Sequence, residues 1–126
     1  MVDIMPGMAT GPRPGSLLPL SPAVFHILMA LADDDRHGYA IIHEVRARTN
    51  GEVRLGPGTL YRSIQNMLDA DLIVEVNERP APDLDDERRR YYRITPFGRA
   101  VARAETSRLN ELVRLARASG FHTRKA

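Results

Sequence analysis

The sequence predicts a mainly α-helical domain with a small β-wing and one long C-terminal helix. Two observations support this fold class. Apolar residues recur at the helical spacing of three and four in separate segments between residues 21 and 119, and the spacing becomes two only near residues 72–77 and 91–94. Prolines at positions 22, 57 and 96 also stand where helices are expected to begin.

Composition restricts the class of protein. The chain has 126 residues, which suffices for one domain with a modest core, and its 43% hydrophobic and 27% charged residues are typical of a globular protein. No apolar run approaches the roughly 20 residues of a membrane helix, and the N-terminus lacks the pattern of a secretory signal. We therefore expect a cytoplasmic protein with no membrane partner.

No metal, cofactor or enzymatic activity is expected. Cysteine is absent, and the histidines at positions 26, 37, 43 and 122 lack the spacing of metal ligands. A phosphate loop of an enzyme at residues 56–59 would need the Walker lysine and a nucleophile with its base, and the sequence supplies neither there.

Positive charge is concentrated in two parts of the chain. The net charge is only +2, but residues 36–70 carry five Arg against three acids, and residues 91–126 carry eight Lys or Arg against two Glu. All but one of the 18 cations are Arg, whose planar guanidinium suits phosphate and guanine better than an ammonium group does. This distribution is compatible with a nucleic-acid partner.

The N-terminal segment and the first helix differ in their patterns. Residues 1–20 hold seven Pro or Gly and no periodic apolar face, which predicts a flexible arm. Ser21 and Pro22 then form a capped helix start. Phe25 and Met29 add apolar surface on another side, so we expect a second subunit to cover them. The core stripe of this helix is formed by Val24, Ile27, Leu28 and Leu31.

A second helix is predicted from about His37 to Thr49. Asn50 and Gly51 end it, because both tolerate the left-handed backbone of a helix C-terminus. Residues 53–55 are expected to form a short strand before the next helix, so the order is that of a helix-turn-helix. The apolar set of the second helix is Tyr39, Ile41, Ile42 and Val45.

Residues 56–72 form a third helix with two chemically different sides, starting at Gly56 and Pro57. Arg can bond guanine, Asn or Gln can bond adenine, and Tyr can contact a base or a phosphate. The polar side therefore fits a helix that enters a DNA major groove, and an ordinary solvated surface is the alternative. The buried stripe is Leu60, Ile64, Met67 and Leu68, and the polar side is Tyr61, Arg62, Gln65, Asn66 and Asp69.

After Leu72 the apolar period changes to two. Val74 and Val76 alternate on one predicted strand, and Tyr92 and Ile94 alternate on another. Two strands joined by the loop 78–90, directly after a helix-turn-helix, form a wing. Residues 21–95 are therefore predicted to be a winged helix-turn-helix domain.

The last helix is predicted over residues 96–119, with Thr95 and Pro96 at its start, Gly120 after its end and a tail at 120–126. A helix of roughly 23 residues is about 35 Å long, more than this core requires. We expect its distal half to form a homodimer with a partner chain. The apolar stripe available for this contact is Leu109, Leu112, Val113 and Ala116.

Four motifs occur in a characteristic order: His37-Gly38-Tyr39 with Ile42, then Gly58-Thr59-Leu60-Tyr61, then Leu72-Ile73, and finally Arg90-Tyr91-Tyr92-Arg93-Ile94-Thr95 with Gly98. Over about residues 20–100 this set resembles the PadR-like family of bacterial winged-helix transcriptional regulators. The resemblance implies a homodimeric DNA-binding repressor, commonly relieved by a small-molecule effector, with the first and last helices supplying dimer contacts. The single helix after the wing resembles the compact branch of that family.

The expected DNA contacts lie on the third helix. The family motif assigns Tyr61 to DNA and favours a phosphate contact for Thr59, while Arg62, Gln65 and Asn66 are candidates for contacts to bases. Two alternatives stay open: Tyr61 as a satellite core residue, and Thr59 as a helix-start residue whose hydroxyl is satisfied within the protein.

The wing departs from the family pattern because its tip, residues 83–87, carries four carboxylates that would repel DNA phosphates. Only Arg88, Arg89 and Arg90 at the wing base are then expected contacts, with a self-paired charge cluster as the alternative. No Trp is present, although some compact members use one to stack a flat ligand. Two functions compete: a dimeric repressor on a near-palindromic operator, and a winged helix that binds only protein through its acidic wing.

Overall fold

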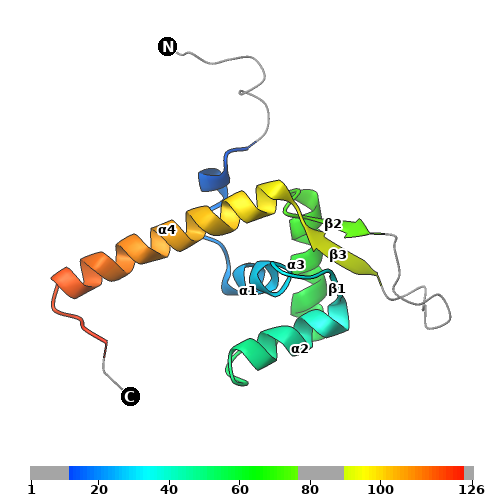
Figure 1. Ribbon diagram of the computed structural model, residues 1–126, viewed down its shortest axis with the longest axis horizontal. Coiled ribbons are helices and arrows are strands. Elements are labelled where there is room, and N and C mark those ends of the chain that lie inside the picture. The colour runs from blue at the N-terminus through cyan, green and yellow to red at the C-terminus, as the bar shows by residue number, and fades with distance from the viewer. Residues whose placement is uncertain (1–11, 77–89, 124–126) are drawn as a thin grey trace, which may run out of the picture.

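In the computed structural model, which describes residues 12–76 and 90–123, four α-helices pack beside a small sheet that lies at one side of the domain (Figure 1). This is the mainly α-helical fold with a β-wing that the sequence predicts. The elements in chain order are the 3-10 helix η2 (Pro14–Leu17), α1 (Pro22–Ala30), β1 (Arg36–His37), α2 (Gly38–Arg48), α3 (Pro57–Asp69), β2 (Ile73–Val76), β3 (Tyr91–Ile94) and α4 (Pro96–Ala118).

Side chains cap three of the four α-helices at their N-termini. The Ser21 hydroxyl accepts a hydrogen bond from the backbone N–H of Val24 at α1, and the Thr95 hydroxyl accepts one from Gly98 at α4. At α2 the acceptor is Nδ1 of His37, which lies 3.1 Å from the backbone nitrogen of Ala40. These bonds satisfy N–H groups that have no partner inside the helix.

The core lies where α1, α2 and α3 meet the sheet and the first turns of α4. The predicted stripes of α1 and α3 face it, and Tyr92 and Ile94 of β3 do so as well, as their alternation predicts. Fully or almost fully buried apolar side chains are Ile27, Leu28, Leu31, Ile41, Val45, Leu60, Ile64, Met67, Leu72, Ile73, Tyr92, Ile94 and Val101.

The sheet is antiparallel, with β3 in the middle between β1 and β2. One sequence prediction is wrong here, and one apolar strand residue faces outward. The short strand expected at residues 53–55 is absent from the described chain, and Arg36–His37 pairs with β3 instead. On β2 the buried residue is Ile73, while Val74 is 41% exposed. Because strand side chains alternate between faces, placing Ile73 inside turns Val74 outward.

The junction between β3 and α4 is held against the junction between α3 and β2. The Thr95 hydroxyl donates to the carbonyl of Asp71 over 2.6 Å, and the Thr95 N–H donates to the carbonyl of Leu72. A Cβ added to Gly98 would collide with that same carbonyl of Leu72, so only glycine permits the approach. These contacts fix the direction in which α4 leaves the domain.

The flexible arm predicted for residues 1–20 is wrong for its second half, while residues 1–11 lie outside the described part. Residues 14–17 form η2, and three leucines at positions 17, 18 and 20 pack against the core. The Leu20 N–H donates to Oε2 of the buried Glu105 on α4 over 3.3 Å. Leucine side chains and this carboxylate anchor a segment whose Pro and Gly content alone indicated flexibility.

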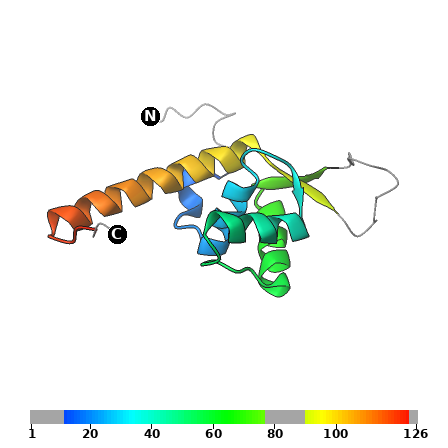
Figure 2. The same cartoon turned by 60° about the horizontal axis from the view of Figure 1, so that its bottom comes forward.

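Helix α4 runs away from the domain in both views (Figures 1 and 2). Its first turns pack on the core through Val101, and Leu109, Leu112 and Val113 are 36%, 48% and 47% exposed. The helix ends before Gly120, whose positive φ of 96° suits the left-handed conformation expected there. The predicted apolar stripe on the distal half therefore has no cover within the described protomer.

The contacts of Glu105 predict that the stability of the fold depends on pH. Its carboxylate accepts hydrogen bonds from Arg108 over 2.6 and 2.9 Å, and these bonds hold the pKa of Glu105 below its ordinary value of 4.5 despite burial. A depressed folded-state pKa means that the stabilisation is present above the unfolded-state pKa and is lost as the pH falls through the folded-state pKa. Glu105→Gln should cost about 1 kcal/mol at pH 7 in urea unfolding.

The difference in unfolding free energy between the wild type and Glu105→Gln should shrink as the pH falls below the ordinary value of 4.5 and through the lowered pKa of Glu105. Glu111→Gln is the matched control, because Glu111 has the same spacing from Arg114 but both side chains are exposed. If the difference in unfolding free energy between the wild type and Glu105→Gln stays constant from neutral to acid pH, the stabilisation does not come from the charge of Glu105.

Candidate nucleic-acid interface

Helix α3 presents the polar face that the sequence predicts. Its buried side chains, at positions 60, 63, 64 and 67, point into the core and fix the rotation of the helix. Because the core holds one side, the opposite side must face solvent. The structure brings together on that exposed side Thr59, Tyr61, Arg62, Gln65 and Asn66, the five α3 residues predicted to contact DNA.

Hydrogen bonding distinguishes the members of this face. The Gln65 amide donates to Oδ1 of Asp69 over 3.0 Å, so it is held along the helix. Within residues 12–76 and 90–123, the side chains of Arg62 and Asn66 make no hydrogen bond or ion pair. These two side chains can meet base edges without first breaking a contact, whereas Gln65 has to leave Asp69.

Tyr61 of α3 lies against the start of α2 and near Tyr92 of β3, and it is 52% exposed. A Cβ added at Gly38, the first residue of α2, would be 2.6 Å from its hydroxyl oxygen. Burial raises the pKa of Tyr92 on β3, and Glu75 and Tyr61 contribute further to that rise. Tyr61 is thus partly packed and partly exposed, next to the base of the wing.

The first turn of α3 offers backbone donors. Gly56 precedes the helix without a side-chain cap, and the first helical hydrogen bond runs from the N–H of Leu60 to the carbonyl of Gly56 over 2.9 Å. The N–H groups of Gly58 and Thr59 stand before that bond, so they and the exposed Thr59 hydroxyl suit an anionic oxygen.

The wing is described only at its base. Strands β2 and β3 pair from Ile73 opposite Ile94 to Val76 opposite Tyr91. Arg90 is exposed just before β3, with its Nε 3.8 Å from a carboxylate oxygen of Glu75. Arg88, Arg89 and the acidic tip at residues 83–87 lie outside the described residues.

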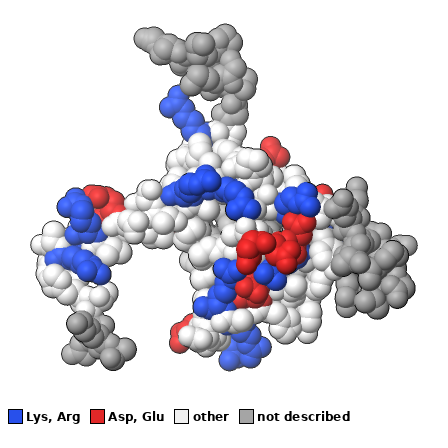
Figure 3. All heavy atoms as spheres, in the orientation of Figure 1, with Lys and Arg blue, Asp and Glu red and all other residues white. Residues whose placement is uncertain are grey.

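A second group of charges lies over the loop after α1, where Figure 3 shows acidic side chains gathered among basic ones. Arg93 holds Asp35 through both oxygens, with the shortest distance 2.8 Å. Asp33 and Glu44 pair with Arg36 and Arg48. Basic side chains in this patch are therefore already neutralised.

Residues 27–104 match the sequence model of the transcriptional regulator PadR-like family. The chain belongs to this family. PadR-like regulators are DNA-binding proteins without enzymatic activity. The helix-turn-helix and wing base described above fall within the matched residues.

Similar proteins agree with this assignment. A transcriptional regulator of Mycobacterium tuberculosis is 35% identical over 98 residues, which are 78% of this chain and 85% of that protein. The fold resembles a PadR family transcription regulator from Clostridium difficile, at 21% identity and a TM-score of 0.67, with 80% of this chain and all of that chain covered. A transcriptional regulator from Clostridium thermocellum matches at 23% identity and a TM-score of 0.65, covering 76% and 87% of the two chains.

In the portions of this PadR-like regulator that the structure describes, His, Asp and Glu side chains form no group of three that could hold a metal ion. None of the described helices is long and apolar enough to span a bilayer.

Sequence reasoning placed one exposed residue in the core. Tyr39 was expected on the apolar set of the second helix, but its side chain is 66% exposed and packs edge-on against His43 at a ring distance of 4.5 Å. Tyr39 directly follows buried Gly38 and lies two residues before buried Ile41. Hydropathy does not predict this exposure, because tyrosine occurs on the buried and on the exposed side of helices.

The contact between Gly38 and Tyr61 can be tested by a double-mutant cycle. Gly38→Ala places a methyl group against the Tyr61 hydroxyl, so it should destabilise the wild type by about 1 kcal/mol. In a Tyr61→Ala background the hydroxyl is gone and only Leu60 Cδ2, 3.2 Å from the added methyl group, remains close, so Gly38→Ala should cost much less than in the wild type. Equal effects of Gly38→Ala on urea unfolding in the two backgrounds would show that the residues do not interact.

Proposed function

We propose that this PadR-like regulator is a sequence-specific repressor that binds a near-palindromic operator as a homodimer. The observation that carries the proposal is the outward face of α3, on which Arg62 and Asn66 stand exposed beside Tyr61 and have no side-chain partner among the described residues. A guanidinium and an amide are the groups that bond guanine and adenine in a major groove. Two such helices, one from each subunit, would enter grooves one helical turn apart, which is about 10 bp.

Contacts to DNA phosphates are also part of the proposal. The free N–H groups at the start of α3 and the Thr59 hydroxyl suit one phosphate, and Arg90 at the wing base suits another. Arg88 and Arg89 are proposed to act in the same way. The alternative of a winged helix that binds only protein gains no support from α3, whose one acidic side chain, Asp69, already accepts a bond from Gln65.

The dimer is supported by a groove between α1 and α4 of about 350 Å³. Three residues predicted for the dimer line it, namely Phe25, Met29 and Leu109. The other three, Leu112, Val113 and Ala116, continue the stripe along the distal half of α4. A second copy offers an identical stripe and groove, as an isologous interface requires.

Relief by a small-molecule effector is also part of the proposal. A second groove between α1 and α4, of about 440 Å³, has an apolar floor that includes Leu28 and Met29. Arg99 and Arg103 lie at its polar side. The size is that of a ligand site, and the arginines favour an anionic compound. Such a ligand would act only if it binds the DNA-competent and DNA-incompetent dimers unequally.

Base reading is tested with duplexes from the region upstream of the gene and with a random duplex of equal length. Arg62→Ala should reduce the preference for the operator by about 1 to 3 kcal/mol, because a base contact is lost. Arg117→Ala, which removes the same charge from the last turn of α4, should leave that preference intact. If the wild type binds tightly and both variants keep the full preference for the operator over the random duplex, Arg62 does not belong to the interface.

Dimerisation is tested by sedimentation. The wild type should have twice the mass of one chain, and Leu112→Ser should shift the mass towards the monomer, because a polar group then enters the apolar contact. Leu115→Ser is the control, since Leu115 is 47% exposed like its neighbours but lies off the stripe. A monomeric wild type, or equal effects of the two substitutions, would contradict the proposed interface.

A further inference from the structure

Helix α2 carries an exposed stripe that the predicted interface does not include. Tyr39, His43 and Arg46 stand at positions i, i+4 and i+7, so they line one side of the helix, and all three are exposed. The rings of Tyr39 and His43 meet edge to face at an interplanar angle of 74°. We call these three residues the α2 stripe.

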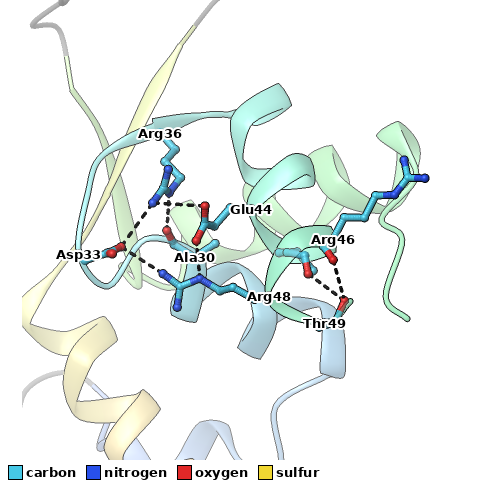
Figure 4. Close-up of polar contacts among 8 residues, drawn as sticks. Ala30, Asp33, Arg36, Glu44, Arg46, Arg48 and Thr49 are labelled. Carbon is cyan, nitrogen blue, oxygen red and sulfur yellow. Dashed lines mark hydrogen bonds and ion pairs between the residues drawn. The ribbon is translucent and has the colours of Figure 1, made fainter. Parts of the chain in front are cut away.

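The other sides of α2 are occupied. Gly38, Ile41 and Val45 are buried in the core. Glu44 and Arg48 face the loop after α1, where Glu44 lies 2.6 Å from Nε of Arg48 and pairs with Arg36 as well. Figure 4 shows this ion-pair network on one side of α2 and the side chain of Arg46 pointing away from it.

The charges on the two exposed sides therefore differ. Arg48 is neutralised by Glu44 and by Asp33, whose Oδ1 lies 3.3 Å from its Nη2. The guanidinium of Arg46 has no hydrogen bond or ion pair within the described residues, and the α2 stripe contains no carboxylate. The stripe thus presents a phenol, an imidazole and a guanidinium, each able to donate a hydrogen bond to a phosphate oxygen.

The α2 stripe begins beside the proposed reading helix. The first residue of α2, Gly38, touches Tyr61 of α3, and Tyr39 is the next residue along. When the second helix of a helix-turn-helix lies in the major groove, the first helix crosses the sugar–phosphate backbone. The side of α2 that is both exposed and free of carboxylates is then the one that suits the phosphates.

We propose that the α2 stripe binds the phosphate backbone flanking the groove occupied by α3, without reading sequence. This inference rests on the proposed DNA-binding function and extends it to a surface on a different helix. It predicts that Arg46 contributes to operator and random DNA alike, whereas Arg48, two residues away on the same helix, contributes to neither.

The test measures the affinity of the full-length protein for a random duplex and for a duplex from upstream of the gene over a series of salt concentrations. Each phosphate contact contributes about 0.9 to the slope of log K against log salt. Arg46→Ala should therefore weaken binding to both duplexes and reduce the slope by roughly one unit. Arg48→Ala is the matched control and should leave the slope unchanged. Tyr39→Phe, which removes only the hydroxyl, should weaken both duplexes without changing the slope.

The outcomes separate this inference from the function on which it rests. A wild type that binds neither duplex contradicts the proposed function itself. Wild-type binding with equal slopes for Arg46→Ala and the wild type overturns the role of the α2 stripe alone. Equal loss in Arg46→Ala and Arg48→Ala overturns it too, because the effect would then follow net charge. Unchanged thermal unfolding of each variant shows that the fold is intact.

Discussion

The interface depends on the burial of one side of α3. Leu60, Ile64 and Met67 are held among α1, α2 and the sheet, and they leave the helix no other rotation about its axis. A fully buried side chain of this size contributes about 1.5 to 3 kcal/mol, so three of them outweigh any preference of the polar residues for a different orientation. The direction of Arg62 and Asn66 is thus a consequence of core packing.

The neighbouring elements are fixed relative to α3 by close contacts at two glycines and by the hydrogen bonds of Thr95. Gly38 lets α2 approach Tyr61, and Gly98 lets α4 approach the carbonyl of Leu72. Thr95 adds hydrogen bonds that tie the end of β3 to the turn after α3. The wing base and the start of α4 therefore hold defined positions next to the helix proposed to read DNA.

Periodicity predicted the fold because each helix has one dominant buried side and a marked start. Pro22, Pro57 and Pro96 placed three starts correctly, and the alternation of Tyr92 and Ile94 placed the central strand. The errors have different causes. Hydropathy alone does not say whether an apolar or aromatic residue is inside: Val74 is 41% exposed beside buried Ile73, and Tyr39 is 66% exposed although the same helix buries Ile41. The packing of residues 14–20 depends on Glu105, 85 residues away from Leu20, and no local pattern reports that contact.

The exposed face of α3 was predicted from sequence, but which of its side chains form hydrogen bonds was not. Sequence spacing did not distinguish Gln65 from Asn66, whereas in the structure the Gln65 amide donates to Asp69 and the Asn66 side chain has no hydrogen bond within the described residues. If two copies of this face enter successive major grooves, hydroxyl-radical footprinting on DNA from upstream of the gene should show two protected regions about 10 bp apart, or a multiple of that, related by two-fold symmetry. A single unpaired region, or no protection at concentrations where the protein is dimeric, would contradict this arrangement.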